Sequence, residues 1–209
     1  MTLNVEQARH AMIEQQVRPW NVVDMPALNA LSSIPREDFV PEEYKNLAFS
    51  DTALPIGHDQ WMLKPIVEGR MLQALQLNAN DDVLLVGTGT GFSTACLAHL
   101  VRAVTSIDIH ADFIQSAERK LKQLEFTNVQ FETADALSYQ PSHQFDAIAI
   151  TGAVAQVPET FKHWLRPNGR LFIIHGQSPA MEAVCITRTG EAFETESLFE
   201  TDIPYLTGA

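Results

Sequence analysis

The sequence predicts an α/β fold: a doubly wound, mostly parallel seven-stranded sheet preceded by a helical N-terminal extension. From position 83 onward, short apolar runs alternate with amphipathic segments, as in parallel strands that helices cover on both faces. The first apolar run ends in the glycine-rich turn 87–91, which is typical of Rossmann-like nucleotide-binding folds. A length of 209 residues suits one such domain and is short for two. We therefore expect a single domain, 1–209.

Residues 1–80 are expected to form helices and an active-site loop. Apolar residues at helical spacing predict a first helix that Pro19 ends: Val5, Ala8, Met12, Ile13 and Val17. Asp24 and Pro26 are a cap and a first-turn proline for a second, short helix. Residues 48–64 are predicted to be a long loop, which we interpret as a substrate lid because long ordered loops tend to be functional. Pro65 opens a third helix.

Residues 81–209 are expected to form the cofactor-binding α/β core. The predicted strands are 83–86, 103–107, 129–131, 147–150 and 170–174, with two more near Val184 and Leu198 that close the sheet. The predicted helices of this part are 94–101 and 111–124.

Charge and composition exclude several classes of partner. The formal net charge of -12 repels phosphate backbones, so we expect no nucleic acid. No targeting segment and no apolar run of ~18 residues is found, which predicts a cytoplasmic protein without a membrane partner. Cys96 and Cys185 are far apart, lack a CxxC partner and lie in apolar patterns, so we expect neither a metal nor a disulfide.

The turn Gly87-Thr88-Gly89-Thr90-Gly91 predicts a nucleotide site. Glycine lets a ligand approach the backbone, and a carboxylate at the end of the next strand accepts hydrogen bonds from ribose hydroxyls. Asp108 follows Gly87 by 21 positions (108 − 87), close to the spacing of about twenty expected for such an acid. This spacing suits NAD and S-adenosylmethionine equally.

Position 92 separates these two ligands. A dinucleotide loop requires glycine or alanine at its sixth place, where Phe92 stands. The loop instead resembles the first motif of class I methyltransferases, and Asp135 stands where these enzymes place a carboxylate near the adenine amino group. The alternative for Asp108 and Asp135 is that they only cap the segments that follow.

The segment after the fourth predicted strand disfavours methylation of a nucleic-acid base. Ile150-Thr151-Gly152-Ala153 lacks the Asn/Asp-Pro-Pro-aromatic run with which base methyltransferases hold a flipped base.

Five segments resemble the protein-L-isoaspartate O-methyltransferase family: 34–41 (IPREDFVP), 51–58 (DTALPIGH), 83–92 (VLLVGTGTGF), 151–158 (TGAVAQVP) and 204–207 (PYLT). The resemblance implies a class I methyltransferase fold with added N-terminal helices. It also implies methyl transfer from S-adenosylmethionine to the free carboxylate of an isoaspartyl residue in a damaged protein. That carboxylate is ionised at neutral pH and needs no general base, so His58 is interpreted as a loop-packing residue.

The resemblance also assigns site residues. The substrate loop comprises Ile56, Gly57, His58, Gln60, Trp61, Met62, Leu63 and Lys64. The cofactor residues are Gly87, Thr88, Gly89, Gly91, Asp108, Ile109, Asp135, Ala136 and Thr207. No metal ligand and no catalytic residue is assigned.

Three positions depart from the family pattern. Leu63 replaces the active-site serine and cannot donate a hydrogen bond, and Trp61 is much larger than the threonine it replaces. Leu85 replaces a glutamate of the glycine motif. Lys64 can supply a charge for an acidic acceptor, or be an ordinary exposed lysine at a helix start.

These departures leave three hypotheses open. The first is a carboxyl methyltransferase acting on isoaspartyl residues in proteins or peptides. The second is a methyltransferase with another, smaller and more apolar acceptor, because Trp61, Met62 and Leu63 make the pocket less polar. The third is a protein that binds the cofactor without turnover. A dehydrogenase is the most distant alternative.

Overall fold

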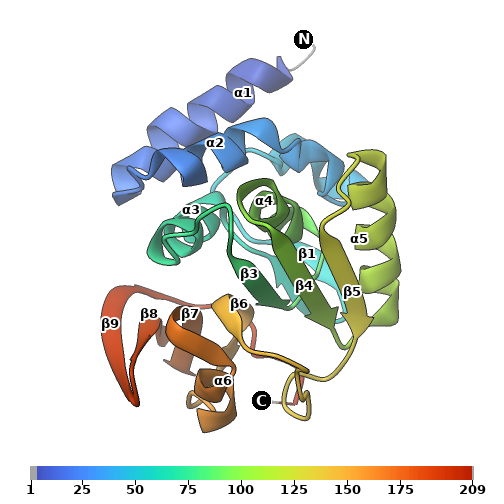
Figure 1. Ribbon diagram of the computed structural model, residues 1–209. Helices are drawn as coiled ribbons and strands as arrows, with labels where there is room; N and C mark the ends of the chain where they lie inside the picture. The colour runs from blue at the N-terminus through green and yellow to red at the C-terminus, as the bar shows by residue number, and fades with distance from the viewer. Residues whose placement is uncertain (1–3, 209) are drawn as a thin grey trace.

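A seven-stranded sheet in the order β5-β4-β3-β6-β7-β8-β9 forms the centre of the computed structural model, which describes residues 4–208 (Figure 1). The strands are β3 (Asp82–Val86), β4 (Ala103–Asp108), β5 (Val129–Thr133), β6 (Phe145–Val154), β7 (Leu165–Gln177), β8 (Ala180–Thr189) and β9 (Ala192–Thr201). All pairs from β5 to β7 are parallel, whereas β8 is antiparallel to both β7 and β9. The predicted mostly parallel sheet of seven strands is confirmed.

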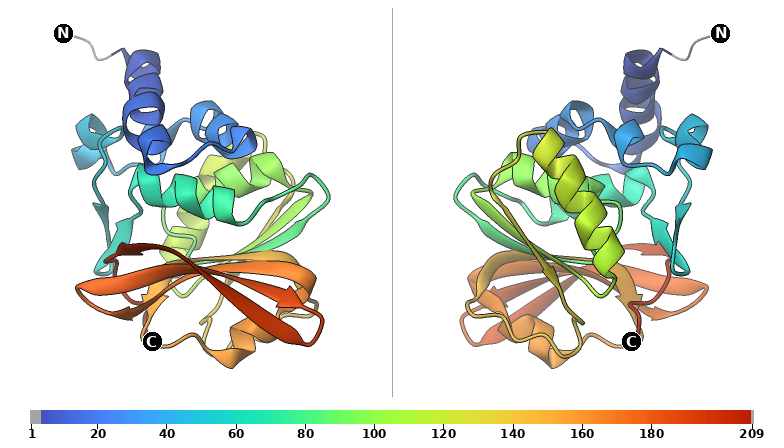
Figure 2. Two further views of the ribbon diagram at one scale, coloured as in Figure 1. Left: turned by 90° about the vertical axis from the view of Figure 1, so that its left-hand side faces the viewer. Right: turned by 90° about the vertical axis from the view of Figure 1, so that its right-hand side faces the viewer.

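Helices cover both faces of this sheet. They are α1 (Val5–Met12), α2 (Met25–Ser33), α3 (Pro65–Ala74), α4 (Phe92–Leu100), α5 (Ala111–Gln123) and α6 (Glu159–His163). Helices α1 to α4 lie on one side of the sheet and α6 on the other (Figure 2). Among the helices of residues 4–208, none combines the length and the apolar character needed to cross a bilayer.

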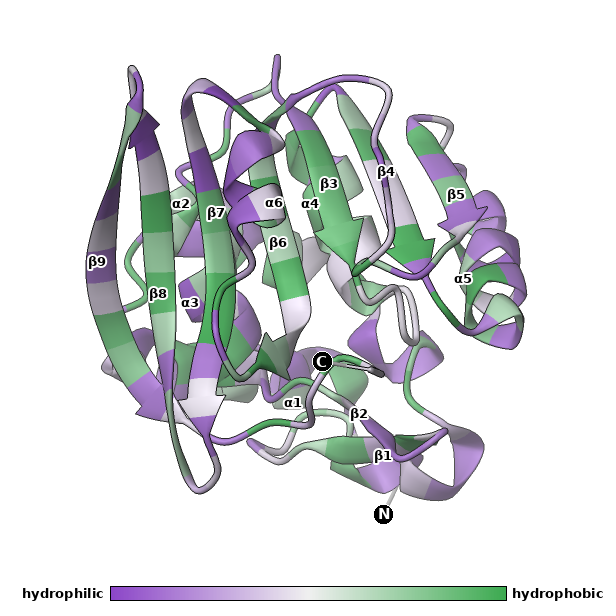
Figure 3. Cartoon of the chain, turned by 90° about the horizontal axis from the view of Figure 1, so that it is seen from below, coloured by the Kyte–Doolittle hydropathy of each residue, from purple (hydrophilic) through white to green (hydrophobic). Residues whose placement is uncertain are grey.

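The alternation of side chains along the central strands divides the interior into two cores. Val83 and Leu85 of β3 pack into the core beneath α1 to α4, while Leu84 and Val86 pack into the core beside α6. All four are nearly inaccessible to solvent, and each such burial contributes about 1.5–3 kcal/mol. Figure 3 shows the resulting hydrophobic central strands beside the largely hydrophilic edge strand β9.

The segment predicted to be a plain loop, 48–64, contains a β-hairpin, so that expectation was wrong for its second half. Strands β1 (Leu54–Gly57) and β2 (Gln60–Met62) pair antiparallel across a two-residue turn. The turn residues His58 and Asp59 both have positive φ, at 52° and 55°. Tight two-residue hairpin turns have this backbone conformation, and Asn-Gly is the sequence that usually predicts them. His-Asp is not typical of such turns.

Several element boundaries also differ from the predictions. Helix α4 begins at Phe92, two residues earlier than expected, because Gly91 with φ of 90° caps it. The first helix ends as an α-helix at Met12, and a π-helical turn continues it to Val17. Helix α6 was not predicted, and the last strands are longer than their apolar centres. Boundaries fall where capping and pairing, rather than periodicity, decide.

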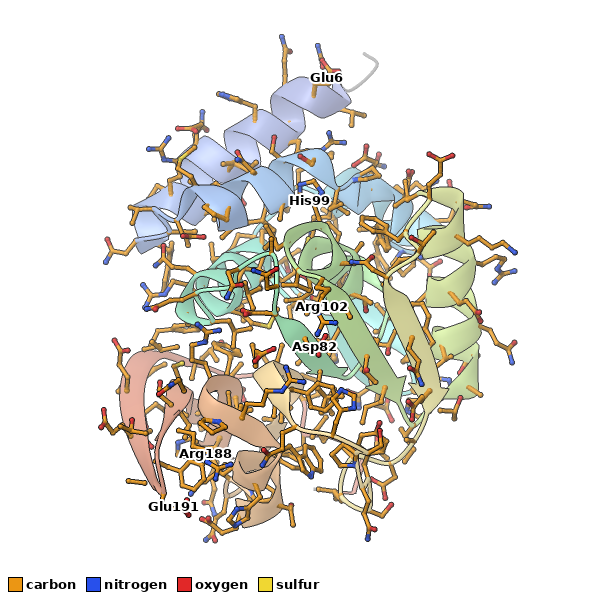
Figure 4. All side chains as sticks on the ribbon, in the orientation of Figure 1. Glu6, Asp82, His99, Arg102, Arg188 and Glu191 are labelled. Atoms are coloured by element: carbon orange, nitrogen blue, oxygen red, sulfur yellow. The ribbon has the colours of Figure 1, made fainter. Side chains whose placement is uncertain are left out.

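Ion pairs fasten one end of the sheet and leave the other available for a site. Asp82 at the start of β3 accepts hydrogen bonds from Arg102 at 2.5 Å and Arg166 at 3.1 Å. Figure 4 shows Arg102 beside Asp82. Arg166 also pairs with Asp146 at the start of β6. The carboxyl ends of β3, β4 and β6 point away from this network, toward the β1–β2 hairpin and the C-terminus (Figure 3).

Candidate functional site

The first position of the glycine loop at the end of β3 accepts only glycine. Gly87 has φ of 90°, and a Cβ there would lie 2.3 Å from Oγ1 of Thr151. The Thr151 hydroxyl donates a hydrogen bond of 2.7 Å to the Gly87 carbonyl oxygen, which ties the loop to β6. Any side chain at position 87 would break this contact and strain the backbone.

Asp108 holds the loop from the end of the neighbouring strand β4. One carboxylate oxygen accepts a hydrogen bond from the Gly89 amide and the other from the His110 amide, both at 2.9 Å. The residue is 8% exposed. An ionised carboxylate has about four acceptor sites, so two amide contacts leave capacity for ligand hydroxyls. Asp108 therefore shapes the loop and can also bind a ligand.

A pocket opens between this loop, the ends of β4 and β5, and the β1–β2 hairpin; we call it the glycine-loop pocket. The predicted site residues that line it are Ile56, Gln60, Trp61, Gly87, Gly89, Asp108, Ile109, Asp135, Ala136 and Thr207. The lining residues that the sequence analysis did not anticipate are Val86, Ile107, His110, Phe113, Ala134, Leu137 and Leu206. Most of these neighbour a predicted residue, so the strand ends already indicated the region.

Other predicted cofactor residues lie away from the pocket surface. Thr88 is 3% exposed, and its hydroxyl is 2.7 Å from that of Ser106, within the protein. A Cβ on Gly91 would lie 2.8 Å from Cβ of Ala117, so Gly91 permits α4 and α5 to pack closely. Asp135 lines the pocket and also accepts a hydrogen bond from the Leu137 amide at 2.9 Å, so it caps the segment that follows and is also accessible from the pocket.

A second cavity of about 380 Å³ adjoins the glycine-loop pocket, and Trp61 lines both. Of the predicted loop residues, Met62, Leu63 and Lys64 also line this adjoining cavity. Its other lining residues are Ala53, Val67, Ser178, Met181, Thr201, Asp202, Ile203, Pro204 and Tyr205. The substrate loop is therefore divided between two spaces, with the half-exposed Trp61 at their junction.

The C-terminal segment forms a wall common to both spaces. The Ala153 amide donates to the Pro204 carbonyl oxygen and the Leu206 amide to the Ala153 carbonyl oxygen, both at 2.8 Å. Tyr205 consequently faces the adjoining cavity, and Leu206 and Thr207 line the glycine-loop pocket. Of these residues, only Thr207 was predicted from the sequence.

A buried ion pair supports the substrate loop from beneath. The Arg36 guanidinium pairs with Glu68 of α3 and donates to the carbonyl oxygens of Ala48 at 2.9 Å and Leu63 at 2.7 Å. Burial raises the pKa of Glu68 from 4.5 to about 7, although Arg36 opposes this shift. This pair was not predicted from the sequence, because Arg36 and Glu68 are 32 positions apart.

The tip of the hairpin contacts the start of α5. His58 Nε2 lies 3.0 and 3.2 Å from the two carboxylate oxygens of Asp112, which lowers the pKa of that carboxyl group. The His58 ring stacks on His110 with 3.9 Å between centroids. Gly57 and His58 thus belong to this contact and line neither pocket. No role was predicted for His110 from the sequence.

The charges around the glycine-loop pocket indicate the kind of ligand it accepts. Of the described residues that line it, none is Lys or Arg, while Asp108 and Asp135 are acidic. This surface suits a cationic ligand with hydroxyl and amino groups, as S-adenosylmethionine is, rather than a pyrophosphate. Leu85, which departs from the family motif, is fully buried in the core and does not line the pocket.

Comparisons with known proteins agree with this geometry. The family model for protein-L-isoaspartate(D-aspartate) O-methyltransferase matches residues 7–202. A protein-L-isoaspartate O-methyltransferase of Aliivibrio fischeri is 35% identical over 203 residues, 96% of this chain and 97% of the relative. One from Yersinia enterocolitica is 36% identical over 184 residues, 88% of both chains.

Solved structures show the same fold. A Plasmodium falciparum protein described as a protein-L-isoaspartate O-methyltransferase, in complex with S-adenosyl-L-homocysteine, superposes with a TM-score of 0.82 at 17% identity, over 97% of this chain and 98% of its own. A second protein-L-isoaspartate O-methyltransferase reaches 0.81 at 21% identity, over 94% of this chain and 65% of its own. Because the model match and the full-length relatives both span the glycine loop, the hairpin and the sheet, the chain belongs to the protein-L-isoaspartate O-methyltransferase family of S-adenosylmethionine-dependent enzymes.

Proposed function

We propose that this protein transfers a methyl group from S-adenosylmethionine to the free carboxylate of L-isoaspartyl residues in proteins. The observation that carries the proposal is the junction at Trp61, where the glycine-loop pocket meets the adjoining cavity. A methyl donor in the first space and a carboxylate in the second would meet there. Family membership supports both ligands.

The glycine-loop pocket fits the donor. Gly87 and Gly89, both with positive φ, keep the backbone open to the ligand, and Asp108 has acceptor capacity for the ribose hydroxyls. Asp135 and Ala136 lie where the adenine would be held, beside the half-exposed Ile109. Thr207 closes the same pocket from the C-terminal segment. Thr88 and Gly91 would act indirectly, by fixing the loop and α4.

The adjoining cavity would receive the acceptor. Met62 and Leu63 give it apolar walls, and Lys64 brings a cation to its rim. Lys64 has no ion-pair partner among the described residues, so its charge is available to an acidic peptide. Ile56 and Gln60 would carry Trp61 on the hairpin, and Gly57 and His58 would hold the hairpin tip.

The reaction demands positioning more than proton transfer. S-adenosylmethionine supplies a methyl group bound to a positively charged sulfur. The acceptor carboxylate, with a pKa near ~4, is already ionised, and its oxygen needs only to be held in line with the methyl carbon. Trp61, Leu63 and Tyr205 would exclude water from the junction, which favours a step that neutralises two opposite charges.

The apolar walls also support a second candidate, a methyltransferase with a smaller and less polar acceptor. The apolar residues that line this cavity include Trp61, Met62, Leu63, Val67 and Met181. Leu63 offers no hydrogen bond to a carboxylate. A small uncharged acceptor would occupy this cavity without needing Lys64.

The test is methyl transfer from labelled S-adenosylmethionine to an isoaspartyl peptide, with the same peptide carrying normal aspartate as control. We expect label on the isoaspartyl peptide alone. A thermal-shift comparison of S-adenosylhomocysteine with NAD(H) checks the donor site separately, because only a bound ligand raises the melting temperature. Stabilisation by S-adenosylhomocysteine without peptide labelling would favour the smaller acceptor or binding without turnover.

A further inference from the structure

We propose that His58, His110 and Asp112 form a binding site for one divalent transition-metal ion, with Zn²⁺ as the reference ion. The three residues come from two separate elements, the tip of the β1–β2 hairpin and the start of α5. One ligand atom from each lies within 4.8 Å of the others. Imidazole nitrogens and a carboxylate oxygen are ordinary ligands of Zn²⁺.

The spacing is close to that of a coordinated ion. With Zn–N of about 2.0–2.1 Å and Zn–O of about 2.0–2.2 Å at tetrahedral angles, two ligand atoms of one ion lie about 3.4 Å apart. His58 Nε2 and the Asp112 carboxylate oxygens, at 3.0 and 3.2 Å, are already close to this separation. The third ligand atom lies within 4.8 Å of the others, so the remaining gap has to close by at most about 1.4 Å.

His110 supplies an unsatisfied nitrogen. Among the residues that the structure describes, its Nε2 atom is buried and has no hydrogen-bond partner. A buried polar atom without a partner is uncommon in native proteins and calls for an unseen ligand, water or ion. The side chain lies between the glycine-loop pocket, which it lines, and the ring of His58.

Coordination requires one rotation. The two imidazole rings are stacked with 13° between their planes, so their lone pairs run side by side instead of converging on one point. The His58 side chain is 42% exposed in the two-residue turn, so its ring has room to tilt out of the stack toward His110 while Nε2 stays beside Asp112. The site then has three protein ligands and a fourth position for water, as open zinc sites do.

Such an ion would join the hairpin to α5 across the rim of the glycine-loop pocket. Ile56, Gln60 and Trp61 of the hairpin line this pocket, as does His110. Fixing the hairpin tip therefore slows the exit of a ligand from the pocket. This consequence rests on the proposed function, whereas metal binding itself does not.

The first test is calorimetric titration of Zn²⁺ into tag-free, chelator-treated protein without any nucleoside. We expect one ion per chain with a dissociation constant in the micromolar range. His58→Ala and His110→Ala should each weaken binding at least tenfold, and so should Asp112→Asn. His175→Ala is the matched control, because His175 faces Glu182 at 3.7 Å between β7 and β8, and should bind as the unaltered protein does.

Absorption spectra with Co²⁺ as the probe provide a second readout. Visible bands typical of nitrogen and oxygen ligands should appear in the unaltered protein and be lost in His58→Ala, whose substitution on the exposed tip leaves the core intact. No binding by 1 mM Zn²⁺, or equal binding by His58→Ala, would overturn the site. The dissociation rate of S-adenosylhomocysteine should fall severalfold with Zn²⁺ only when His58 is present. Zn²⁺ binding without S-adenosylhomocysteine binding would reject the proposed function and leave the metal site standing.

Discussion

Arg36 donates a hydrogen bond of 2.7 Å to the carbonyl oxygen of Leu63 and pairs with the carboxylate of Glu68. The same guanidinium lies 4.7 Å from the ring centroid of Phe92, the first residue of α4. One buried side chain thus connects the end of the substrate loop with α3 and with the helix that follows the glycine loop. This side chain therefore fixes the position of the substrate loop relative to the glycine loop in the proposed active site.

Replacing Arg36 should therefore destabilise the protein strongly. Arg36→Met leaves the buried Glu68 carboxyl group and the carbonyl oxygens of Ala48 and Leu63 without their partner, and we expect a loss of about 3–5 kcal/mol in the free energy of unfolding, measured by denaturant titration. Arg36→Met with Glu68→Leu removes both polar groups of the pair and should recover a large part of this loss. A double variant no more stable than the single one would show that the backbone contacts, rather than the ion pair, dominate.

Glu68 should give the protein a distinct pH dependence of stability. Its folded-state pKa of about 7 lies above the ordinary value of 4.5, so the folded state binds more protons than the unfolded state between these pH values. Stability due to Glu68 is therefore highest below pH 4.5 and falls as the pH rises to about 7. Glu68→Gln should remove this slope. Parallel unfolding curves for both proteins from pH 4.5 to 7.5 test this, and an unchanged difference across that range would contradict it.

Asp108 should contribute to donor binding. Asp108→Ala removes the acceptor for ribose hydroxyls and releases the Gly89 amide, so we expect S-adenosylhomocysteine to bind about 1–3 kcal/mol more weakly by calorimetry. Asp38→Ala, which removes the same charge from an exposed position far along the chain, is the control. Equal affinities for Asp108→Ala and the control would remove Asp108 from the binding site.

Gly152 should be needed to seat the C-terminal segment. A Cβ on Gly152 would lie 2.6 Å from Cδ2 of Leu206, so Gly152→Ala pushes away the wall that both pockets share. We expect a cost of about 1–3 kcal/mol in stability and weaker S-adenosylhomocysteine binding. Leu206→Ala should partly restore both in the double variant. Failure of this rescue would place the clash elsewhere, for example on the Leu206 backbone nitrogen at 3.1 Å.

Leu63 should limit activity on isoaspartyl peptides. Its side chain lines the adjoining cavity while its carbonyl oxygen is held by Arg36, so the position is fixed and only the side chain changes. Leu63→Ser supplies a hydroxyl donor to a carboxylate, and a bond of about 1.5–3 kcal/mol corresponds to a roughly 10- to 100-fold gain in kcat/KM. Leu63→Ala makes the same space without the donor. Equal rates for the two variants would exclude a role for the hydroxyl.

Local sequence signals predicted much of the fold and of the donor site. The alternation of apolar runs fixed β3, β4 and α5 to within about two residues, because these elements are buried on regular faces. The glycine turn and Asp108 were placed correctly at adjoining strand ends, where the Gly89 amide meets the Asp108 carboxylate. The family and the methyltransferase fold were confirmed.

The hairpin shows why the rest was not predicted. The turn His58-Asp59 has no glycine or asparagine, and its conformation is imposed by strand pairing and by contacts with α5. The contact of Thr88 could not be predicted either, because its hydroxyl lies beside that of Ser106, 18 positions away. Both depend on contacts that pattern reading cannot supply.

The sequence by itself determined the class of sheet, the glycine turn, the acids at the strand ends and the family. Each of these depends on a short pattern of residues that lie close together in the sequence. Only the tertiary structure decided that the substrate loop divides between two pockets, that residues 203–207 form their common wall, and that Arg36, Glu68 and Leu63 meet. These relationships join segments more than 25 positions apart, and their geometry follows from packing the N-terminal helices and the C-terminal segment against one sheet.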